Sequence, residues 1–581
     1  MAVTPLVHGG DHVAAALQAQ GVPCIFTLCG GHISPILAAA KARGLRIVDT
    51  RDEVTAVFAA DAFARLTGRP GVAAVTAGPG ITNTITALKN AQLAQSPLLL
   101  IGGAAPTALQ GRGALQDIDQ RPLVVPHVKR FFKLRRVADL APAVAEGFAL
   151  AMQGVPGPVF LECPVDLLYD EANIRQWYAD AAGKGSSLAE RGLRWYLNRH
   201  AQRMLAGAAQ VVVPAAVHVP PPQAADGALA QAAAALARAE RPLMVIGSQA
   251  LLDAAQADAL AQAVGSLSVP VYLSGMARGL LGPDHPLQRR HARRNALREA
   301  DVVLLAGVPC DFRLDYGRHV RRSATLIAAN RSAKDARLNR RPNVAAIGDA
   351  GQFIRALAGR VQRREAWAGW LETLAGRDRA REAEIDTQAA AAGEYVNPLA
   401  FFRAMDATAA PDALFVADGG DFVATASYVL RPRGPLAWLD PGAFGTLGVG
   451  AGFALGAAVA RPGRELWIVF GDGACGWSLS EIDSFVRQGF AVIMVVGNDA
   501  GWTQIAREQV KMLKDDVATV LARTDYHRVA EGFGAAGLCV KSADQVLPAL
   551  QQARALAAQG RAVLVNVWLD KTEFREGSLS M

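Results

Sequence analysis

The sequence predicts an α/β protein built from three doubly wound parallel-sheet domains in series. The chain has 581 residues, more than one hydrophobic core usually serves. Its composition, 51% hydrophobic and 19% charged, is typical of globular proteins. Short apolar runs alternate with amphipathic helical stretches along most of the chain, which indicates parallel sheets with helices on both faces. The alternation is interrupted twice, and the interruptions divide the chain into three domains.

The first predicted domain covers residues 1–172. Its helical patterns cover residues 10–20, 33–42, 54–67 and 81–95. Its strand patterns cover residues 24–28, 45–48, 72–76, 97–101 and 158–164. Residues 173–226 break the rhythm, with a charged helical stretch at 188–205 and three consecutive prolines at 220–222. Because proline fixes φ and donates no hydrogen bond, we predict a partly extended connecting segment here.

The second predicted domain is a central α/β domain, residues 227–362, and a helical linker, residues 363–395, leads to the third, residues 396–581. Strand patterns of the central domain cover residues 242–247, 270–274, 301–307 and 324–328. Those of the third domain cover residues 413–418, 466–470, 491–496 and 562–567. Residues 441–460 carry no charged side chain and are long enough to resemble a membrane span, but they contain six glycines. We therefore expect a turned loop entering a closely packed helix.

Composition and charge exclude several classes of partner. The net charge is +8, which suits anionic small molecules. The densest basic run, residues 289–294, has no interleaved aromatic residues, so we interpret it as a solvated face and expect no nucleic-acid partner. The six cysteines form no Cys-x-x-Cys pair, and the N-terminus has no charged-then-apolar leader. We expect a reduced, cytoplasmic protein with no structural zinc and no membrane partner.

The strongest functional signal is the stretch from residue 466 to residue 503. A buried strand ends on Gly471-Asp472-Gly473, a helical pattern follows, and the next strand leads to Asn498. Strand tips in such a unit lie side by side where open α/β sheets bind ligands. A carboxylate and an amide oxygen suit Mg²⁺, which would bridge the protein to a diphosphate held near a helix start. The alternative is an ordinary turn, because glycine and aspartate are common turn residues.

This turn and its spacing to Asn498 resemble the thiamine diphosphate signature of the acetolactate synthase superfamily. The resemblance covers nearly the whole chain and is closest to acetolactate synthase-like proteins of the 2-hydroxyacyl-CoA lyase type. Further segments that carry it are residues 274–286, 307–317, 496–510 and 571–579. It implies thiamine diphosphate and Mg²⁺ as cofactors, with the metal held by Asp472, Asn498 and the main-chain carbonyl of Ala500. By the same resemblance, the domain at residues 1–172 would bind the pyrimidine end of the cofactor and the domain at residues 396–581 its diphosphate. Asp499 stands where family members often have a second Asn.

Three further residues acquire roles from the resemblance. Taken alone, Glu53 at the start of a predicted helix is a carboxylate favoured by the helix dipole. The resemblance implies that it contacts the aminopyrimidine ring and promotes loss of the thiazolium C2 proton. Gln116 falls in a loop that resembles one facing the reacting carbon, with Leu115 where an aromatic residue is common. Leu447 would support the bent conformation of thiamine from below.

The other cofactor-binding residues that the resemblance implies lie mainly in glycine-rich turns. They are Gly78, Pro79, Gly80, Asn83, Gly420, Asp421, Phe422, Gly445, Gly471, Gly473, Ala474, Gly501 and Trp502. Trp502 is also a candidate for the substrate pocket. In the family, the glutamate and the diphosphate site of one active centre come from different subunits, which implies a homodimer or homotetramer. The arginine pattern that contacts flavin in acetolactate synthases is poorly matched, so we do not expect FAD.

The expected reaction is cleavage of a 2-hydroxyacyl-CoA to an aldehyde and formyl-CoA. The alternative within the family is decarboxylation and carboligation of 2-keto acids, as in acetolactate synthase. A catalytically silent regulatory subunit that binds the cofactor is a second alternative, against which Glu53 argues. A nicotinamide oxidoreductase is a third, but no Gly-x-Gly-x-x-Gly fingerprint follows a strand. The sequence leaves open a CoA ester or a keto acid, and a dimer or a tetramer.

Overall fold

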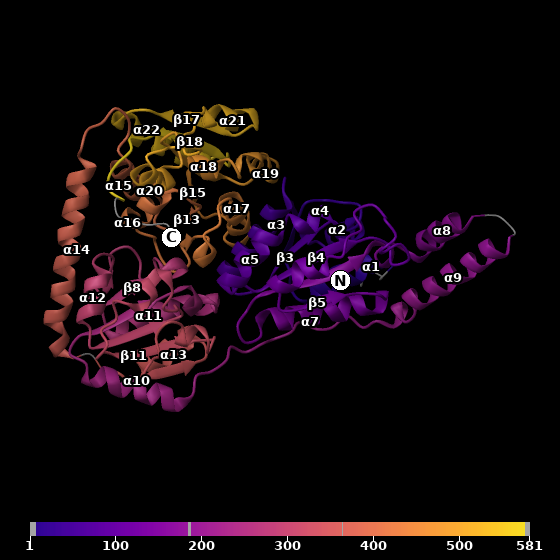
Figure 1. The fold of residues 1–581 in the computed structure, drawn as a ribbon, viewed down its shortest axis with the longest axis horizontal. Helices are drawn as coiled ribbons and strands as arrows, with labels where there is room; N and C mark the ends of the chain where they lie inside the picture. The colour runs from indigo at the N-terminus through magenta and orange to yellow at the C-terminus, as the bar shows by residue number, and fades with distance from the viewer. Residues whose placement is uncertain (1–6, 184–186, 363, 576–581) are drawn as a thin grey trace. The chain divides into compact units, whose positions relative to one another are not determined.

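The computed structural model describes residues 7–183, 187–362 and 364–575. They form three six-stranded parallel sheets with helices on both faces, which confirms the predicted fold class (Figure 1). The chain divides into two compact units. The first comprises Met1–Arg65 and Arg69–Pro220, and the second comprises Leu66–Gly68 and Pro221–Met581. Residues 576–579 of the predicted tail segment lie outside the described residues.

The first unit contains one sheet in the order β2-β1-β3-β4-β6-β5. Its strands are β1 (Cys24–Thr27), β2 (Arg46–Asp49), β3 (Gly71–Val75), β4 (Leu98–Ala104), β5 (Phe131–Lys133) and β6 (Pro158–Pro164). Its helices are α1 (Gly9–Ala19), α2 (Ser34–Ala42), α3 (Glu53–Thr67), α4 (Pro79–Thr82), α5 (Ile85–Ala94), α6 (Arg121–Val124), α7 (Leu140–Met152), α8 (Glu171–Ala182) and α9 (Leu188–Leu205). The strand order reverses between β1 and β3, which is where doubly wound sheets bind ligands.

Two features of this unit differ from the sequence prediction. The predicted helix 81–95 is split into α4 and α5, because the Thr84 hydroxyl donates to the Ile81 carbonyl and competes with the helical pattern. The predicted connecting segment begins with α8, which the sequence reading missed. That helix packs beside α9 and buries Ile174 and Tyr178 in the core of the unit.

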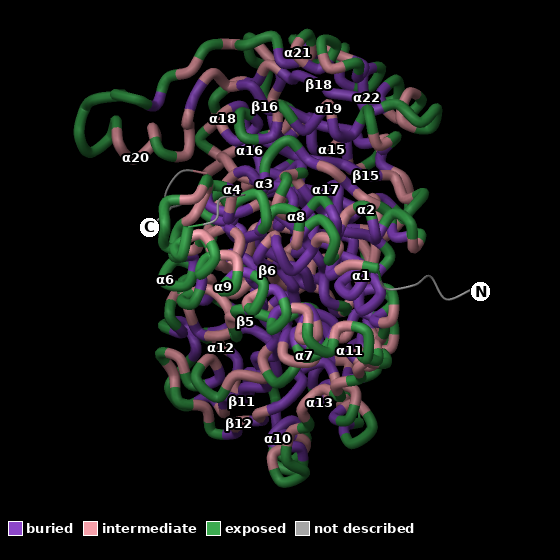
Figure 2. The backbone as a smooth tube through the Cα atoms, turned by 90° about the vertical axis from the view of Figure 1, so that its right-hand side faces the viewer, coloured by how far each residue is buried: buried purple, intermediate pink, exposed green. Residues whose placement is uncertain are grey.

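The second unit contains a central sheet and a C-terminal sheet. The central order is β12-β11-β10-β7-β8-β9, and the C-terminal order is β14-β13-β15-β16-β18-β17. The central strands are β7 (Pro242–Ile246), β8 (Val271–Leu273), β9 (Gln288–Arg289), β10 (Val302–Ala306), β11 (Thr325–Asn330) and β12 (Val344–Ile347). The C-terminal strands are β13 (Leu414–Ala417), β14 (Trp438–Leu439), β15 (Leu466–Gly471), β16 (Val492–Asn498), β17 (Ala536–Val540) and β18 (Val563–Trp568). Figure 2 shows β15, β16 and β18 as largely buried.

Helices cover both sheets of the second unit. Those of the central part are α10 (Asp226–Arg238), α11 (Ala257–Leu267), α12 (Arg293–Glu299) and α13 (Ala350–Ala358). Those that follow are α14 (Ala368–Ala389), α15 (Pro398–Thr408), α16 (Asp421–Val429), α17 (Val449–Ala460), α18 (Asp472–Cys475), α19 (Ile482–Gln488), α20 (Thr503–Leu513), α21 (Tyr526–Gly532) and α22 (Ala543–Ala558). The uncharged stretch 441–460 contains α17, whose first nine residues are all buried, as the glycine content predicts. Among the described residues, no helix is long and apolar enough to cross a membrane.

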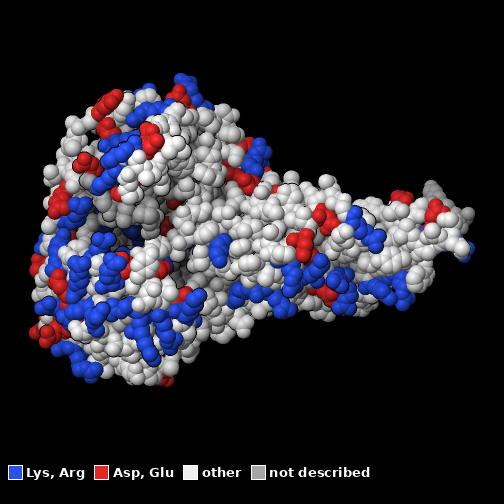
Figure 3. All heavy atoms as spheres, in the orientation of Figure 1, with Lys and Arg blue, Asp and Glu red and all other residues white. Residues whose placement is uncertain are grey.

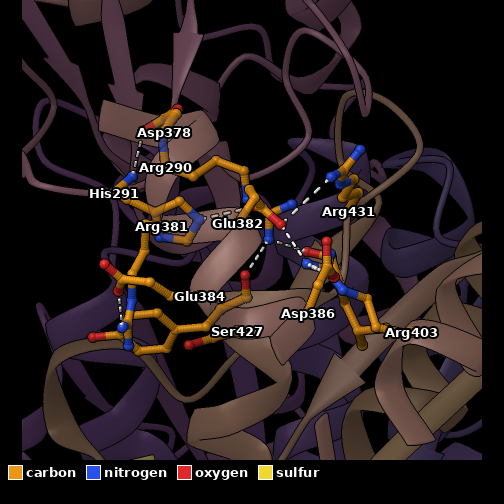
Figure 4. Close-up of polar contacts among 12 residues, drawn as sticks. Arg290, His291, Asp378, Arg381, Glu382, Glu384, Asp386, Arg403, Ser427 and Arg431 are labelled. Carbon is orange, nitrogen blue, oxygen red and sulfur yellow. Dashed lines mark hydrogen bonds and ion pairs between the residues drawn. The ribbon is translucent and has the colours of Figure 1, made fainter. Parts of the chain in front are cut away.

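The long helix α14 joins the central and C-terminal parts through Glu382 (Figure 4). The Glu382 carboxylate lies 2.8 Å from the His291 Nε2 atom and accepts a hydrogen bond of 2.6 Å from Arg403. Arg431 lies 3.6 Å from the same carboxylate. Burial by itself raises the pKa of Glu382, but the hydrogen bonds from His291 and Arg403 and the nearby arginine charges outweigh it and lower this pKa to about 2. Helix α14 is therefore joined to both parts of the unit by polar contacts of Glu382.

Candidate active site

The tips of β15 and β16 bring together the two side chains that the sequence predicts as metal ligands. Gly471 pairs with Gly497 in the sheet register, so Asp472 and Asn498 follow at neighbouring positions of the same edge. The Asn498 amide group donates to the Thr524 carbonyl at 3.1 Å and to Asn566 Oδ1 at 3.2 Å. These two bonds orient the amide, and its buried Oδ1 atom has no hydrogen-bond partner among the described residues. An orphaned amide oxygen of this kind fits a cation ligand.

The Asp472 carboxylate is almost wholly buried, with 2% of the residue exposed. It accepts hydrogen bonds from the main-chain amides of Gly473, at 2.9 Å, and Gly501, at 3.1 Å. Burial and the neighbouring charge of Asp499 raise the pKa of Asp472 to about 7. No Lys or Arg ion pair offsets this charge among the described residues. A divalent cation next to the carboxylate would do so, and the donor set therefore fits Mg²⁺.

The loop after β16 supplies the third predicted ligand. Ala500 has a left-handed backbone, with φ of +57°, and its carbonyl oxygen accepts a hydrogen bond of 3.0 Å from the Leu521 amide. One lone pair of that oxygen is left for a metal. Asp499 stands where the family resemblance expects Asn, and burial raises the pKa of its carboxyl group. The site thus holds the carboxylates of Asp472 and Asp499 together with the Asn498 amide.

Two glycine turns lie directly against each other beside Asp472. The Gly471 amide donates to the Gly419 carbonyl at 3.0 Å, and a Cβ atom on Gly420 would lie 3.3 Å from the Gly471 Cα atom. Gly420 itself has φ of +111°, a conformation that side chains disfavour. The turns therefore leave bare backbone where the resemblance places the diphosphate.

The other residues predicted to bind the cofactor near these turns lie in different surroundings. The Asp421 carboxylate forms an ion pair with Arg507 of α20, at 2.7 Å. Phe422 is buried in the core, with its ring centroid 4.3 Å from that of Phe402, and its ring also packs on Gly497 of β16. Ala474 is buried in α18, whereas Gly445 is exposed, with no heavy atom within 4 Å of a Cβ built on it. The cofactor contacts of these residues stay predictions.

Aromatic side chains flank the glycine turns. A Cβ atom on Gly473 would lie 2.6 Å from the indole ring of Trp502, so that ring packs directly on the turn. Trp502 and Trp477 form an edge-to-face pair with ring centroids 5.9 Å apart. Trp477, 57% exposed, also packs on Gly448, next to Leu447. The sequence reading missed Trp477, although its place two residues after the short helix α18 was a usable signal.

In the first unit, Glu53 opens α3 and is 8% exposed. The Asn83 side-chain amide donates to Glu53 Oε2 at 3.0 Å. A Cβ atom on Gly80 would lie 3.5 Å from Glu53 Oε1, so the glycine loop reaches the other carboxylate oxygen. Glu53 Oε2 is therefore hydrogen-bonded to Asn83, whereas Glu53 Oε1 lies next to Gly80.

Gln116 lies against the same glycine loop. Gly78 has φ of +60°, and a Cβ atom built on it would lie 2.8 Å from the Gln116 carbonyl oxygen. Gln116 also has a positive φ of 60°, which is uncommon for a residue with a side chain. Pro79 and Leu115 are exposed. The first unit thus brings Glu53 and Gln116 together around residues 78–83.

His32 is a further polar residue at this edge that the sequence reading missed. It follows β1, and its Nδ1 atom lies 3.1 Å from the Thr76 hydroxyl after β3. Those two strands flank the reversal of strand order, the usual ligand position. Burial lowers the pKa of His32, which keeps the imidazole neutral at pH 7. A histidine shortly after the first strand was the available signal.

Three domain families match the chain in order. The N-terminal TPP binding domain of thiamine pyrophosphate enzymes matches residues 7–123. The central domain of these enzymes matches residues 229–357, and their C-terminal TPP binding domain matches residues 418–567.

Similar proteins extend over nearly the whole chain. Human 2-hydroxyacyl-CoA lyase 2 is 50% identical over 582 residues, which cover 99% of this chain and 92% of that protein. The Caenorhabditis elegans protein of the same name is 48% identical over 589 residues, covering 99% of this chain and 91% of that protein. The acetolactate synthase large subunit IlvG of Mycobacterium tuberculosis is 36% identical over 573 residues, covering 97% and 96%.

Proposed function

The chain belongs to the thiamine pyrophosphate enzyme family, and from this premise we propose that it cleaves a 2-hydroxyacyl-CoA to an aldehyde and formyl-CoA with thiamine diphosphate and Mg²⁺. The observation that carries the proposal is the pairing of two features in one chain. One is a buried Glu53 that lies against the glycine loop at residues 78–83, and the other is an Asn498 amide oxygen without a hydrogen-bond partner beside the buried Asp472. The roughly half-identical relatives named 2-hydroxyacyl-CoA lyase 2 support the choice of substrate.

Asp472, Asn498 and the Ala500 carbonyl would hold Mg²⁺ in this proposal. The bare backbone of the turns at residues 419–420 and 471–473 would face the diphosphate, where side chains would collide. Leu447, Trp477 and Trp502 would pack around the bound thiamine. Each role follows from the position of the residue beside the two glycine turns.

Glu53 would exchange a proton with the aminopyrimidine ring. When bound, thiamine diphosphate would supply a carbon nucleophile for the thioester carbon and a place for the electron pair of the broken carbon–carbon bond. Asn83 orients the Glu53 carboxylate, and the neutral His32 can hold or release the proton of the substrate hydroxyl group. In the overall reaction that hydroxyl carbon leaves as the aldehyde, and the thioester carbon gains a proton and leaves as formyl-CoA.

Three half-buried arginines in the second unit support an anionic, phosphate-bearing substrate. Arg278, Arg290 and Arg293 donate to main-chain carbonyls and not to carboxylates. Burial lowers the pKa of all three, that of Arg290 to about 10, and the charges of neighbouring arginines add to the effect for Arg290 and Arg293. Lys and Arg also gather over the central part of this unit (Figure 3). The gathering of Lys and Arg over this part of the unit favours binding of an anionic CoA ester.

The competing activity is carboligation of 2-keto acids, which the 36% identity to acetolactate synthase supports. The deciding experiment incubates the purified protein, thiamine diphosphate and Mg²⁺ with pyruvate or with a 2-hydroxyacyl-CoA in parallel. We expect aldehyde and formyl-CoA from the second substrate only. Acetolactate from pyruvate, with no aldehyde from the CoA ester, would contradict the proposal and favour the alternative.

A further inference from the structure

Asp418 is a buried carboxylate next to the candidate active site. It follows β13, at the reversal of strand order between β13 and β15, and only 3% of the residue is exposed. Its Oδ1 atom accepts a hydrogen bond of 2.9 Å from the Gly448 amide, and its Oδ2 atom accepts one of 2.7 Å from the Gly450 amide. Among the described residues, it forms no ion pair with Lys, Arg or His. Both oxygens of the Asp418 carboxylate therefore bind the backbone of residues 448–450.

That piece of backbone begins directly after Leu447. Gly448 is the N-cap of α17 and has φ of +85°, and Gly450 is the second residue of the helix. A carboxylate at this place satisfies two amides that the helix leaves without partners and is favoured by the helix dipole. Because one of the two bonds is to the residue after Leu447, Asp418 fixes where the main chain of Leu447 lies.

The residue after Asp418 fixes the Leu447 side chain. A Cβ atom built on Gly419 would lie 2.1 Å from the Leu447 Cδ2 atom, so the leucine packs directly on the bare glycine. Asp418 and Gly419 are consecutive, which means that one turn holds both the backbone and the tip of the leucine. We infer that Asp418 is a positioning residue that sets the height of Leu447 beneath the thiamine of the bound cofactor. The inference rests on the function proposed above.

The test compares Asp418→Asn with a matched control, Asp349→Asn. Asp349 is another buried carboxylate that caps a helix, α13, by accepting from the Gln352 amide, but it lies in the central part of the unit. Two quantities are measured with Mg²⁺ present: the dissociation constant of thiamine diphosphate by calorimetry, and the rate at which the cofactor C2 proton exchanges with deuterium oxide, by NMR. Neither requires substrate.

We expect Asp418→Asn to bind the cofactor within about threefold of wild type, because Asp418 bonds only to main-chain amides. C2 exchange should slow by about ten- to a hundredfold, because a displaced Leu447 no longer holds the reacting geometry. The Asp349→Asn control should lose melting temperature and keep its exchange rate. An Asp418→Asn variant with the wild-type exchange rate, or a control that slows equally, would overturn the inference.

A double-mutant cycle separates a role through Leu447 from an independent one. If Asp418 acts through Leu447, Asp418→Asn combined with Leu447→Ala should exchange within about twofold of Leu447→Ala alone. Additive losses would overturn the inference. Should Asp418→Asn fail to fold, Asp418→Glu keeps the charge at the helix start while moving the oxygens, and it should slow exchange in the same way. If neither variant folds, the carboxylate serves the fold and not Leu447, which also overturns the inference.

These outcomes are distinguishable from failure of the proposed function. If the wild-type protein neither binds thiamine diphosphate nor exchanges its C2 proton, the proposed function fails. If the wild-type protein does both and Asp418→Asn behaves like it, only the inference about Asp418 fails.

Discussion

Glu53 is the residue on which proton transfer in the proposed reaction depends. Its carboxylate is held by the Asn83 amide and lies against Gly80, so its orientation is set before any ligand binds. A general acid or base in such a position contributes about a hundred- to ten-thousandfold to a rate. An isosteric amide at position 53 retains the shape and loses the proton.

We expect Glu53→Gln to lower the turnover rate by at least about a hundredfold while the affinity for thiamine diphosphate changes little. Steady-state kinetics and calorimetry measure the two quantities. Glu394→Gln, which changes an exposed carboxylate far along the sequence, is the matched control and should leave both unchanged. Undiminished turnover of Glu53→Gln would remove Glu53 from the mechanism.

Residue types and spacing were enough to predict that Asp472 and Asn498 lie at neighbouring strand tips. The Asp472 and Asn498 side chains could be placed side by side because parallel strands end at one edge of a sheet. The part that Asp418 plays could not be found in this way, because it comes from a contact across the fold with α17. The position of Phe422 in the core also depends on packing that spacing does not reveal.

The short helix α18 contains Gly473, whose backbone packs directly against the Trp502 ring. An alanine at this position would place its Cβ atom 2.6 Å from the Trp502 ring and force the ring away. We expect Gly473→Ala to weaken thiamine diphosphate binding by about tenfold or more, because the turn and Trp502 are displaced together. Calorimetry measures the affinity.

Gly369→Ala in α14 is the control for that substitution. No heavy atom lies within 4 Å of a Cβ built on Gly369, so the change should stabilise the helix slightly and leave cofactor affinity alone. Unchanged affinity in Gly473→Ala would show that neither the turn nor Trp502 contributes to binding.

The helix α14 makes a prediction about stability and pH through Glu382. Loss of its charge leaves His291, Arg403 and Arg431 without their common carboxylate, so Glu382→Gln should cost about 1–3 kcal/mol of unfolding free energy at pH 7. Because folding lowers the pKa of Glu382, its contribution is present above the ordinary value of 4.5 and is lost as the pH falls towards about 2. The difference between wild type and variant should therefore be constant from pH 8 to pH 5 and shrink below that.

Urea unfolding at several pH values measures this difference. Glu384→Gln on the same helix is the control: Glu384 is an exposed partner of Arg381, and its loss should cost less than about 0.5 kcal/mol. A Glu382→Gln difference that grows as the pH falls would contradict the sign of the pKa shift.

Element types were predictable because apolar periodicity reports which faces are buried. The helical stretch 188–205 and the central strands of each sheet follow that pattern closely. Helix α8 was missed because charged residues dominate its outer face, and only Ile174, Tyr178 and Ala182 are buried. Edge strands such as β9 and β14 span two residues each and are too short to give a periodic signal.

At the scale of the whole molecule, Glu53 belongs to the first compact unit, and Asp472 and Asn498 belong to the second. We propose that the two halves of an active site come from two subunits. The proposal predicts complementation between two inactive variants, Glu53→Gln and Asp472→Asn, co-expressed with different tags. In mixed dimers one site would carry both changes and the other neither, so about a quarter of wild-type activity should return. Sites formed within one chain would give no recovery.

The central claim is that this chain breaks the bond between the hydroxyl carbon and the thioester carbon of a 2-hydroxyacyl-CoA. The most direct measurement supplies substrate labelled with ¹³C at the thioester carbon to the protein with thiamine diphosphate and Mg²⁺, and follows the label by NMR. We expect the label to appear in formyl-CoA while unlabelled aldehyde accumulates, and we expect Glu53→Gln to form neither. Label that stays in the intact thioester, with turnover of pyruvate to acetolactate by the same preparation, would contradict it.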